Sequence, residues 1–221
     1  MEEASNALLK IGPVEISGVV VTIWVITAVL TVLSIIATRN MKDVPGVMQN
    51  LAEQAVLKLH GYFADILGKK LTDKYFPVLA TFFVFIIVCN YSGLLPGAGH
   101  YAGFKVPTAS LSVTAALAVV GFFLIHTVGV KERGWKGYLK SFLSVMLPLT
   151  LVEQLVRPFS LALRLFGNLF GEEMVTENLY SIFPIVVPLV MQVLSLLFCM
   201  IQALVFTMLL SIYIGEAAEE E

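Results

Sequence analysis

Residues 185–214 read IVVPLVMQVLSLLFCMIQALVFTMLLSIYI and contain no charged side chain. A helix of about 20 apolar residues crosses the roughly 30 Å hydrocarbon core of a bilayer, so this stretch can cross with residues to spare. The whole chain follows the same trend, because 58% of its 221 residues are hydrophobic and only 14% are charged. An ordinary soluble domain carries about 25% charged residues. The composition therefore predicts a polytopic membrane protein.

Other apolar stretches extend this interpretation to an all-α polytopic membrane protein with about five membrane-crossing helices in one membrane domain, residues 1–221. The expected crossing helices are residues 19–38, 76–95, 108–130, 141–177 and 184–214. Residues 43–70 instead mix charged and apolar side chains at near-helical spacing. That spacing predicts an amphipathic helix on the membrane surface, with an ordinary cytoplasmic helix as the alternative.

The last two stretches are longer than one perpendicular crossing needs. At about 1.5 Å per residue, they would form helices of roughly 50 Å and 45 Å. Pro148 and Pro158 could break the first of them into shorter pieces. We expect instead two long, strongly tilted helices that form a hairpin, because packing against another surface can impose a tilt that lipid thickness does not.

Charge and cysteine content exclude several classes of protein. A net charge of −2 is atypical of a nucleic-acid-binding protein. The two cysteines, Cys89 and Cys199, both lie in apolar stretches, which excludes a disulfide framework and a cysteine-rich zinc site. Neither a His-Glu-Xaa-Xaa-His nor a Gly-Xaa-Ser-Xaa-Gly motif occurs. We therefore expect no enzyme activity, no cofactor and no metal site.

Basic residues gather in two segments, Arg39–Lys74 and Lys131–Lys140. The positive-inside rule places both segments in the cytoplasm, which leaves the N-terminus outside and the C-terminus inside. The sequence before residue 19 begins with acidic residues and has no transit-like pattern, which favours a bacterial inner membrane.

One apolar stretch carries charge into the membrane, and residues 153–173 of it read EQLVRPFSLALRLFGNLFGEE. An arginine at the centre of a membrane helix costs about 2.5–3.5 kcal/mol on insertion scales. Arg164 has mostly apolar sequence on both sides. We interpret it as a functional residue, with a buried salt bridge as the alternative.

Helical geometry gathers the polar residues of this segment on one line. At 100° per residue, the side chains within about 40° of that line are those of Glu153, Arg157, Ser160, Arg164, Asn168 and Gly171. Glu173 points to the opposite side, so it is a poor partner for Arg164. Glu153 can pair with Arg157 one turn away, whereas Arg157 can also lie at the membrane interface or bind a lipid headgroup.

The final stretch has a polar face of its own, formed by Gln192, Ser195, Cys199 and Gln202. Hydroxyls and amides in a membrane helix either bond to a neighbouring helix or line water. Bonding between helices is the favoured interpretation for Ser195, Thr207 and Ser211. For Gln192 and Gln202 both interpretations stay open.

Together these motifs resemble the a subunit of F-type ATP synthases, over nearly the whole chain. They are Arg164-Leu-Phe-Gly-Asn168 with Gly171-Glu-Glu173, the approach Pro158–Arg164, Gln202-Ala-Leu-Val-Phe with Tyr213, and the middle segments Cys89–Pro96 and Pro107–Thr114. The resemblance implies a stator subunit beside a rotating ring of c subunits, held with the peripheral-stalk b subunits in the lipid. H⁺ or Na⁺ would reach a ring carboxylate through one aqueous half-channel and leave through another, which drives ATP synthesis in other subunits.

The resemblance also implies roles for single residues, with Arg164 between the half-channels. The other implied ion-path residues are Asn168, Glu173, Gln202, Ser195 and Gln192, and the structural or channel-lining candidates are Glu153, Arg157 and Asn90. Many relatives carry an Asp and an Asn where Ser110 and Ser112 stand, and some carry a His where Ser195 stands. A stand-alone ion channel or secondary transporter is the alternative function, and it would need its own intramembrane carboxylates or paired broken helices.

Overall fold

The computed structural model describes residues 7–11, 14–39, 46–94, 106–142, 147–180 and 186–218. Its elements in chain order are β1 (Ala7–Ile11), β2 (Val14–Ser17), α1 (Gly18–Arg39), α2 (Val47–Leu67), α3 (Lys69–Ser92), the short 3₁₀ turn η2 (Pro107–Ala109), α4 (Leu111–Phe142), α5 (Leu147–Tyr180) and α6 (Val186–Ala218). Strands β1 and β2 pair in antiparallel fashion. This hairpin is an addition to the predicted helices, and its sequence signal is Gly12-Pro13 between two short runs with apolar residues.

Within the described residues, four helices are long and apolar enough to cross a membrane, namely Gly18–Arg39, Lys69–Ser92, Leu111–Tyr138 and Val190–Ala218. The chain is therefore a polytopic, helical membrane protein. Helix α5 is not among these four, although it is 34 residues long. Its charged residues, Arg157 and Arg164 among them, lower the apolar character of every window along it.

Several helix bounds differ from the predicted ones because helices continue into charged sequence. Helix α3 begins at Lys69, directly after Gly68, whose φ of 77° ends α2. Helix α4 extends beyond residue 130 and changes direction at Gly134, where φ is 74°. Residues 141–142, expected to open the next helix, therefore belong to α4. Residues 43–45, 95, 143–146 and 184–185 of the predicted helices lie outside the described residues.

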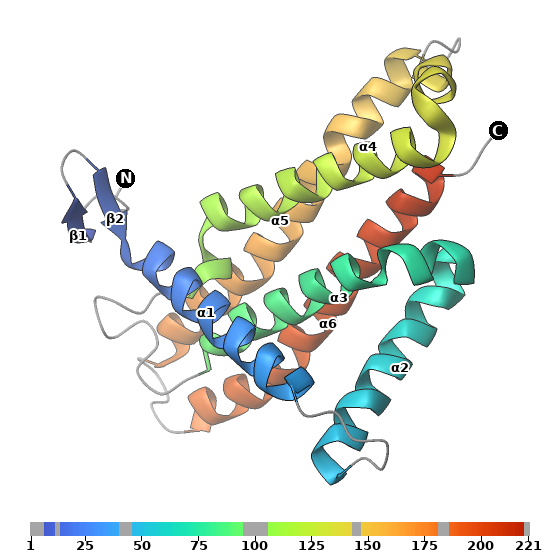
Figure 1. Ribbon diagram of the computed structural model, residues 1–221. Coiled ribbons are helices and arrows are strands. Elements are labelled where there is room, and N and C mark those ends of the chain that lie inside the picture. Colours follow the sequence, from blue (N-terminus) through green and yellow to red (C-terminus); the bar gives the residue numbers. More distant parts are fainter. Residues whose placement is uncertain are drawn as a thin grey trace.

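Helix α6 is the centre of the bundle, since α2, α3, α4 and α5 all pack against it (Figure 1). One face of α6 is fully buried, and it consists of Ala203, Phe206, Leu210 and Ile214. Helix α5 lies between α4 and α6 and buries Leu165 in the same core. Helix α1 lies at the edge, in contact with α3 and η2, and leaves most of its apolar side chains exposed.

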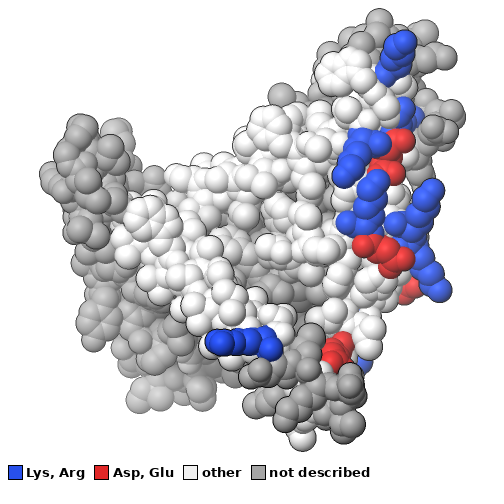
Figure 2. Space-filling view, viewed as in Figure 1, with Lys and Arg blue, Asp and Glu red and all other residues white. Residues whose placement is uncertain are grey.

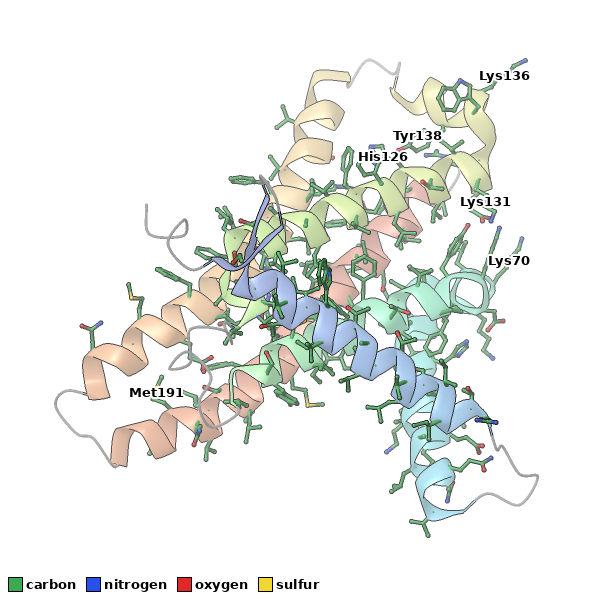
Figure 3. All side chains as sticks on the ribbon, turned by 60° about the vertical axis from the view of Figure 1, so that its left-hand side comes forward. Lys70, His126, Lys131, Lys136, Tyr138 and Met191 are labelled. Atoms are coloured by element: carbon green, nitrogen blue, oxygen red, sulfur yellow. The ribbon has the colours of Figure 1, made fainter. Side chains whose placement is uncertain are left out.

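Charged side chains gather at one end of the molecule, where α2 joins α3 and α4 turns back (Figure 2). Lys74 and the Tyr75 hydroxyl both donate to Glu132, and His60 Nε2 lies 2.9 Å from Asp73 Oδ1. Lys70, Lys131 and Lys136 project outward from this end, whereas Met191 lies at the opposite end of α6 (Figure 3). A single end rich in lysine fits the positive-inside pattern seen in the sequence.

Helix α2 has one half in the bundle and one half outside it. Phe63 and Leu67 are buried in the core. Val47, Leu51 and Val56, in the first half, are exposed. The location of this helix on the membrane surface stays a prediction.

We predict that Gly129→Ala destabilises the protein, because Tyr138 folds back against this glycine. A Cβ at Gly129 would lie 2.9 Å from Cδ2 of Tyr138 and 3.2 Å from the Ala217 carbonyl oxygen. Overpacking of this kind costs about 1–3 kcal/mol. The measurement is the apparent thermal unfolding midpoint of the purified complex in detergent. Gly61→Ala is the matched control, because nothing lies within 4 Å of that position in the described structure and alanine is the better helix former. Equal midpoints for the two variants would contradict the packing at Gly129.

Candidate functional site

Arg164 lies at the middle of α5, about 25 Å from either end of the helix. Its neighbours on the helix surface, Leu161 and Leu165, are buried, but the Arg164 side chain is exposed. Among the side chains that the structure describes, Arg164 makes no ion pair. The alternative of a structural salt bridge therefore finds no partner in this part of the chain; the side chain of Glu173 lies outside it.

Gly167 and Gly171 form a strip of α5 beside Arg164 and Asn168. A Cβ at either glycine would meet no described atom within 4 Å. Both have negative φ within the helix, so backbone conformation does not require glycine at either position. Alanine would favour the helix by about 1 kcal/mol at each. The two glycines leave a shallow strip next to Arg164 that nothing in the described structure fills.

Arg157 has a different environment from Arg164, although both lie on the same line of α5. Its Nη1 lies 2.7 Å from Glu216 Oε2 on α6, and its guanidinium carbon lies 4.8 Å from the centre of the Tyr213 ring. Its Nη2 lies 3.7 Å from Glu153 Oε2, the pairing that the sequence offered as one alternative. Arg157 is thus bound by groups of its own chain.

Three members of the polar face of α6 point into the bundle. Ser195, Cys199 and Gln202 are buried, with at most 7% of each residue exposed. Gln192 is exposed, so the structure does not bring it together with the other three. The hydroxyls of Thr207 and Ser211 donate to carbonyls one turn back in α6, at 2.8 and 2.7 Å. The prediction that these two hydroxyls bond to a neighbouring helix is therefore wrong. Each hydroxyl donates its hydrogen bond to a backbone carbonyl of α6 itself.

Asn90 and Tyr91 at the end of α3 bind the backbone of α6. The Asn90 Nδ2 donates to the Cys199 carbonyl at 3.3 Å, and the Tyr91 hydroxyl donates to the Leu196 carbonyl at 3.2 Å. Asn90 Oδ1 and Gln202 Nε2 are buried and have no hydrogen-bond partner among the described residues. A buried amide atom without a partner costs free energy unless water reaches it. Asn90 on α3 and Gln202 on α6 therefore leave one buried acceptor and one buried donor that the described residues do not satisfy.

Glu172 is a site residue that the sequence analysis missed. It is partly buried on α5 and lies near Cys199 on α6. Glu172 lies two turns after Leu165, so both side chains are on the same side of α5. Because Leu165 is a buried core residue, this shared side is the signal that could have identified Glu172. The structure thus brings Asn90 of α3 and Glu172 of α5 close to Cys199 of α6, and Ser195 and Gln202 are buried on the same side of α6 as Cys199.

Within the described residues no group of His, Cys, Asp or Glu has the arrangement of a metal site. Cys89 and Cys199 are buried free thiols. The chemistry available at the α3–α5–α6 interface is therefore that of hydrogen bonds and one carboxylate, which can carry protons or hold water.

Comparison with known proteins relates the chain to one family. Residues 20–215 match the family described as ATP synthase A chain. The chain is 38% identical over 216 residues to ATP synthase subunit a 2 of Bradyrhizobium sp. strain BTAi1. The aligned region covers 96% of this chain and 94% of that protein. It is 38% identical to ATP synthase subunit a of Moorella thermoacetica, over 94% of each chain. It is 41% identical to ATP synthase subunit a 3 of Pelobacter propionicus, over 89% of this chain and 86% of that one.

We predict that Asn90→Leu leaves the unfolding midpoint of the purified protein unchanged or raises it. The substitution removes one hydrogen bond to a carbonyl that already lies within α6, and it also removes the buried, unpartnered Oδ1. Hydrogen bonds between membrane helices average only about 0.6 kcal/mol. Tyr91→Phe, which removes the neighbouring α3–α6 bond, is the matched control. A fall of many degrees for Asn90→Leu alone would identify Asn90 as a residue that holds the helices together.

Proposed function

The chain belongs to the ATP synthase A chain family, and from this membership we propose how its residues carry ions past Arg164. The protein is subunit a of an F-type ATP synthase, the proton-translocating stator subunit of the membrane sector, and it is not itself catalytic. It works in a complex with the other subunits of that enzyme. A stand-alone channel or transporter is set aside by the family match.

The observation that carries the proposal is the exposed Arg164 at the middle of α5, without an ion pair among the described side chains. A lone cation at this depth is unfavourable unless an anion reaches it. In our proposal that anion is the carboxylate of a c subunit, which arrives and leaves as the ring rotates. A cation within about 4–6 Å favours the ionised carboxylate, so Arg164 promotes release of the ion and blocks direct leakage between the half-channels.

The inlet half-channel, in our proposal, runs along the α3–α5–α6 interface. Asn90, Ser195 and Glu172 lie in the halves of their helices away from the charged end, and Gln202 lies at the middle of α6. Their polar atoms can offer hydrogen bonds to water or protons. Asn168 lies between Glu172 and Arg164 on α5 and is partly buried. Glu173 and Gln192 remain predicted members of this channel. The second half-channel opens at the charged end, where Glu153 and Arg157 lie.

The face of α5 and α6 that carries Arg164 is the surface that we assign to the c ring. It exposes large apolar side chains on both helices, among them Val156 and Val175 on α5 and Leu197 and Ile201 on α6. The strip at Gly167 and Gly171 lets a helix backbone approach closely beside Arg164, as small residues do between membrane helices. In this arrangement α5 is the fifth crossing helix, and α5 and α6 are the tilted hairpin that follows the ring.

The orientation follows from the charged end. The positive-inside rule places that end in the cytoplasm, which puts β1 and β2 outside and the end of α6 inside. We propose the inner membrane of a bacterium, in keeping with the bacterial relatives. We assign the exposed sides of α1 and α2, away from the ring face, to contacts with lipid and with the b subunits of the peripheral stalk.

We predict that Arg164→Ala abolishes ATP-driven proton pumping in membrane vesicles and raises the passive proton leak. Without the cation, ring carboxylates keep their protons past the barrier and protons can cross between the half-channels. Arg39→Ala, which removes an exposed arginine at the end of α1, is the matched control and should pump normally. The amount of c subunit that copurifies with each variant reports assembly. Normal pumping by assembled Arg164→Ala complexes would overturn the proposal.

We predict that Gly167→Leu slows pumping or releases the ring without lowering the stability of this chain. The described structure has open space there, so the added side chain clashes only with a partner. Gly61→Leu places the same side chain in open space on α2, away from the ring face, and should have no effect on pumping. Copurification of c subunits and vesicle pumping are the two measurements. A Gly167→Leu variant that matches Gly61→Leu in both would place the ring elsewhere.

A further inference from the structure

Arg157 joins α5 to α6 at the charged end, and from this contact we propose that it is a positioning residue that fixes the rotation of α5 and so aims Arg164. The proposal rests on the role proposed above for Arg164. It adds to that role the group that holds the cation in place. The contact itself lies entirely within this chain.

The geometry of the contact restrains Arg157 on two sides. Its edge binds Glu216 Oε2 at 2.7 Å, and its face lies over the Tyr213 ring at 4.8 Å. Both partners belong to the last two turns of α6, and 23% of the arginine side chain is exposed. A planar guanidinium that is held at both its edge and its face can adopt only one orientation. A flexible ammonium group in its place would keep several. The second carboxylate, Glu153 at 3.7 Å, belongs to α5 itself and joins no helices.

Helix α5 carries this restraint to Arg164. The two arginines are seven residues apart in one helix, about 10 Å along its axis and within about 20° of the same line. Any rotation that separates Arg157 from Glu216 turns Arg164 by the same angle. A rotation of about 20° moves a group about 6 Å from the axis by about 2 Å. This is a large share of the 4–6 Å over which a cation changes the ionisation of a carboxylate.

The rest of α5 does little to resist such a rotation near Arg164. Leu161 and Leu165 are buried and hold the helix against the bundle, but apolar contacts are non-directional. Gly167 and Gly171 have no side chain with which to anchor the other flank. Each ring carboxylate that passes pulls on Arg164 from that flank. A directional contact on the same line of the helix, such as Arg157 with Glu216, opposes the pull.

A charge exchange tests the proposal. We would compare Glu216→Gln, Arg157→Glu and the double variant Arg157→Glu/Glu216→Arg in assembled complexes, and measure proton pumping per complex and protons pumped per ATP hydrolysed. We expect Glu216→Gln to pump about two- to fivefold less, the range for a partly exposed ion pair, and Arg157→Glu to pump still less. The double variant restores an α5–α6 ion pair and should recover to within about twofold of the unmodified protein.

The controls separate positioning from other roles. Asp65→Asn removes an exposed carboxylate of α2 and should leave pumping per complex unchanged.

If Arg157 acts only in folding, its variants lower the yield of complexes but not pumping per complex, and the proposal fails. If Arg157 carries ions directly, the double variant stays as poor as Arg157→Glu, and the proposal also fails. If Arg157→Glu does not assemble, Glu216→Gln decides alone, because equality with Asp65→Asn overturns the proposal. Pumping by Arg164→Ala would instead contradict the proposed function, whatever the charge exchange shows.

Discussion

Hydrocarbon offers no hydrogen bonds, and this constraint orders the whole molecule. Backbone groups are satisfied inside long helices, and small polar side chains such as Thr207 and Ser211 bond to their own helix. Apolar helices gain little by leaving lipid for one another, so their association depends on close packing. Helix α6 supplies that packing, because four neighbouring helices meet its fully buried face from Ala203 to Ile214. The position of every polar residue of the site follows from its phase relative to this face.

The same constraint separates the polar and charged residues into two groups. Those at the charged end have partners within the chain, as Glu132 has in Lys74 and Tyr75, and Arg157 has in Glu216. Farther from the charged end some polar groups lack partners: Asn90 and Gln202 each have a buried atom without a hydrogen-bond partner among the described residues. Unsatisfied groups at this depth reduce stability, so their presence indicates a use that stability does not explain. Water, a proton or another subunit is what can satisfy them.

The sequence predicted what depends on local composition and helical phase. The apolar run at 19–38 gives α1 almost to the residue, and the cost of an arginine in lipid identifies Arg164 without any structure. Features that depend on distant contacts were not predictable in this way. Glu216 lies 59 residues after Arg157 in the sequence, so their 2.7 Å contact has no local signal. Glu172 was missed because the resemblance pointed to Glu173, and the burial of Leu165, two turns before Glu172, is known only from the structure. The reversal at Gly134 depends on a positive φ that the basic segment around it does not reveal.

The two arginines of α5 illustrate why a working cation must be kept without a partner. Arg157 is satisfied inside the chain, and for that reason it can hold a helix but cannot serve a moving ring. In the proposed function Arg164 has to remain available, yet α5 also carries acids that could neutralise it. Helix phase keeps Glu172 away, because it lies about 80° around the helix from Arg164, toward the buried face. Distance keeps Glu153 away, since it lies about 16 Å along the axis and within 4 Å of Arg157. Among the described side chains, the fold thus leaves the central cation without an anion, which is the condition that our proposal requires of a stator that acts on each passing carboxylate and then releases it.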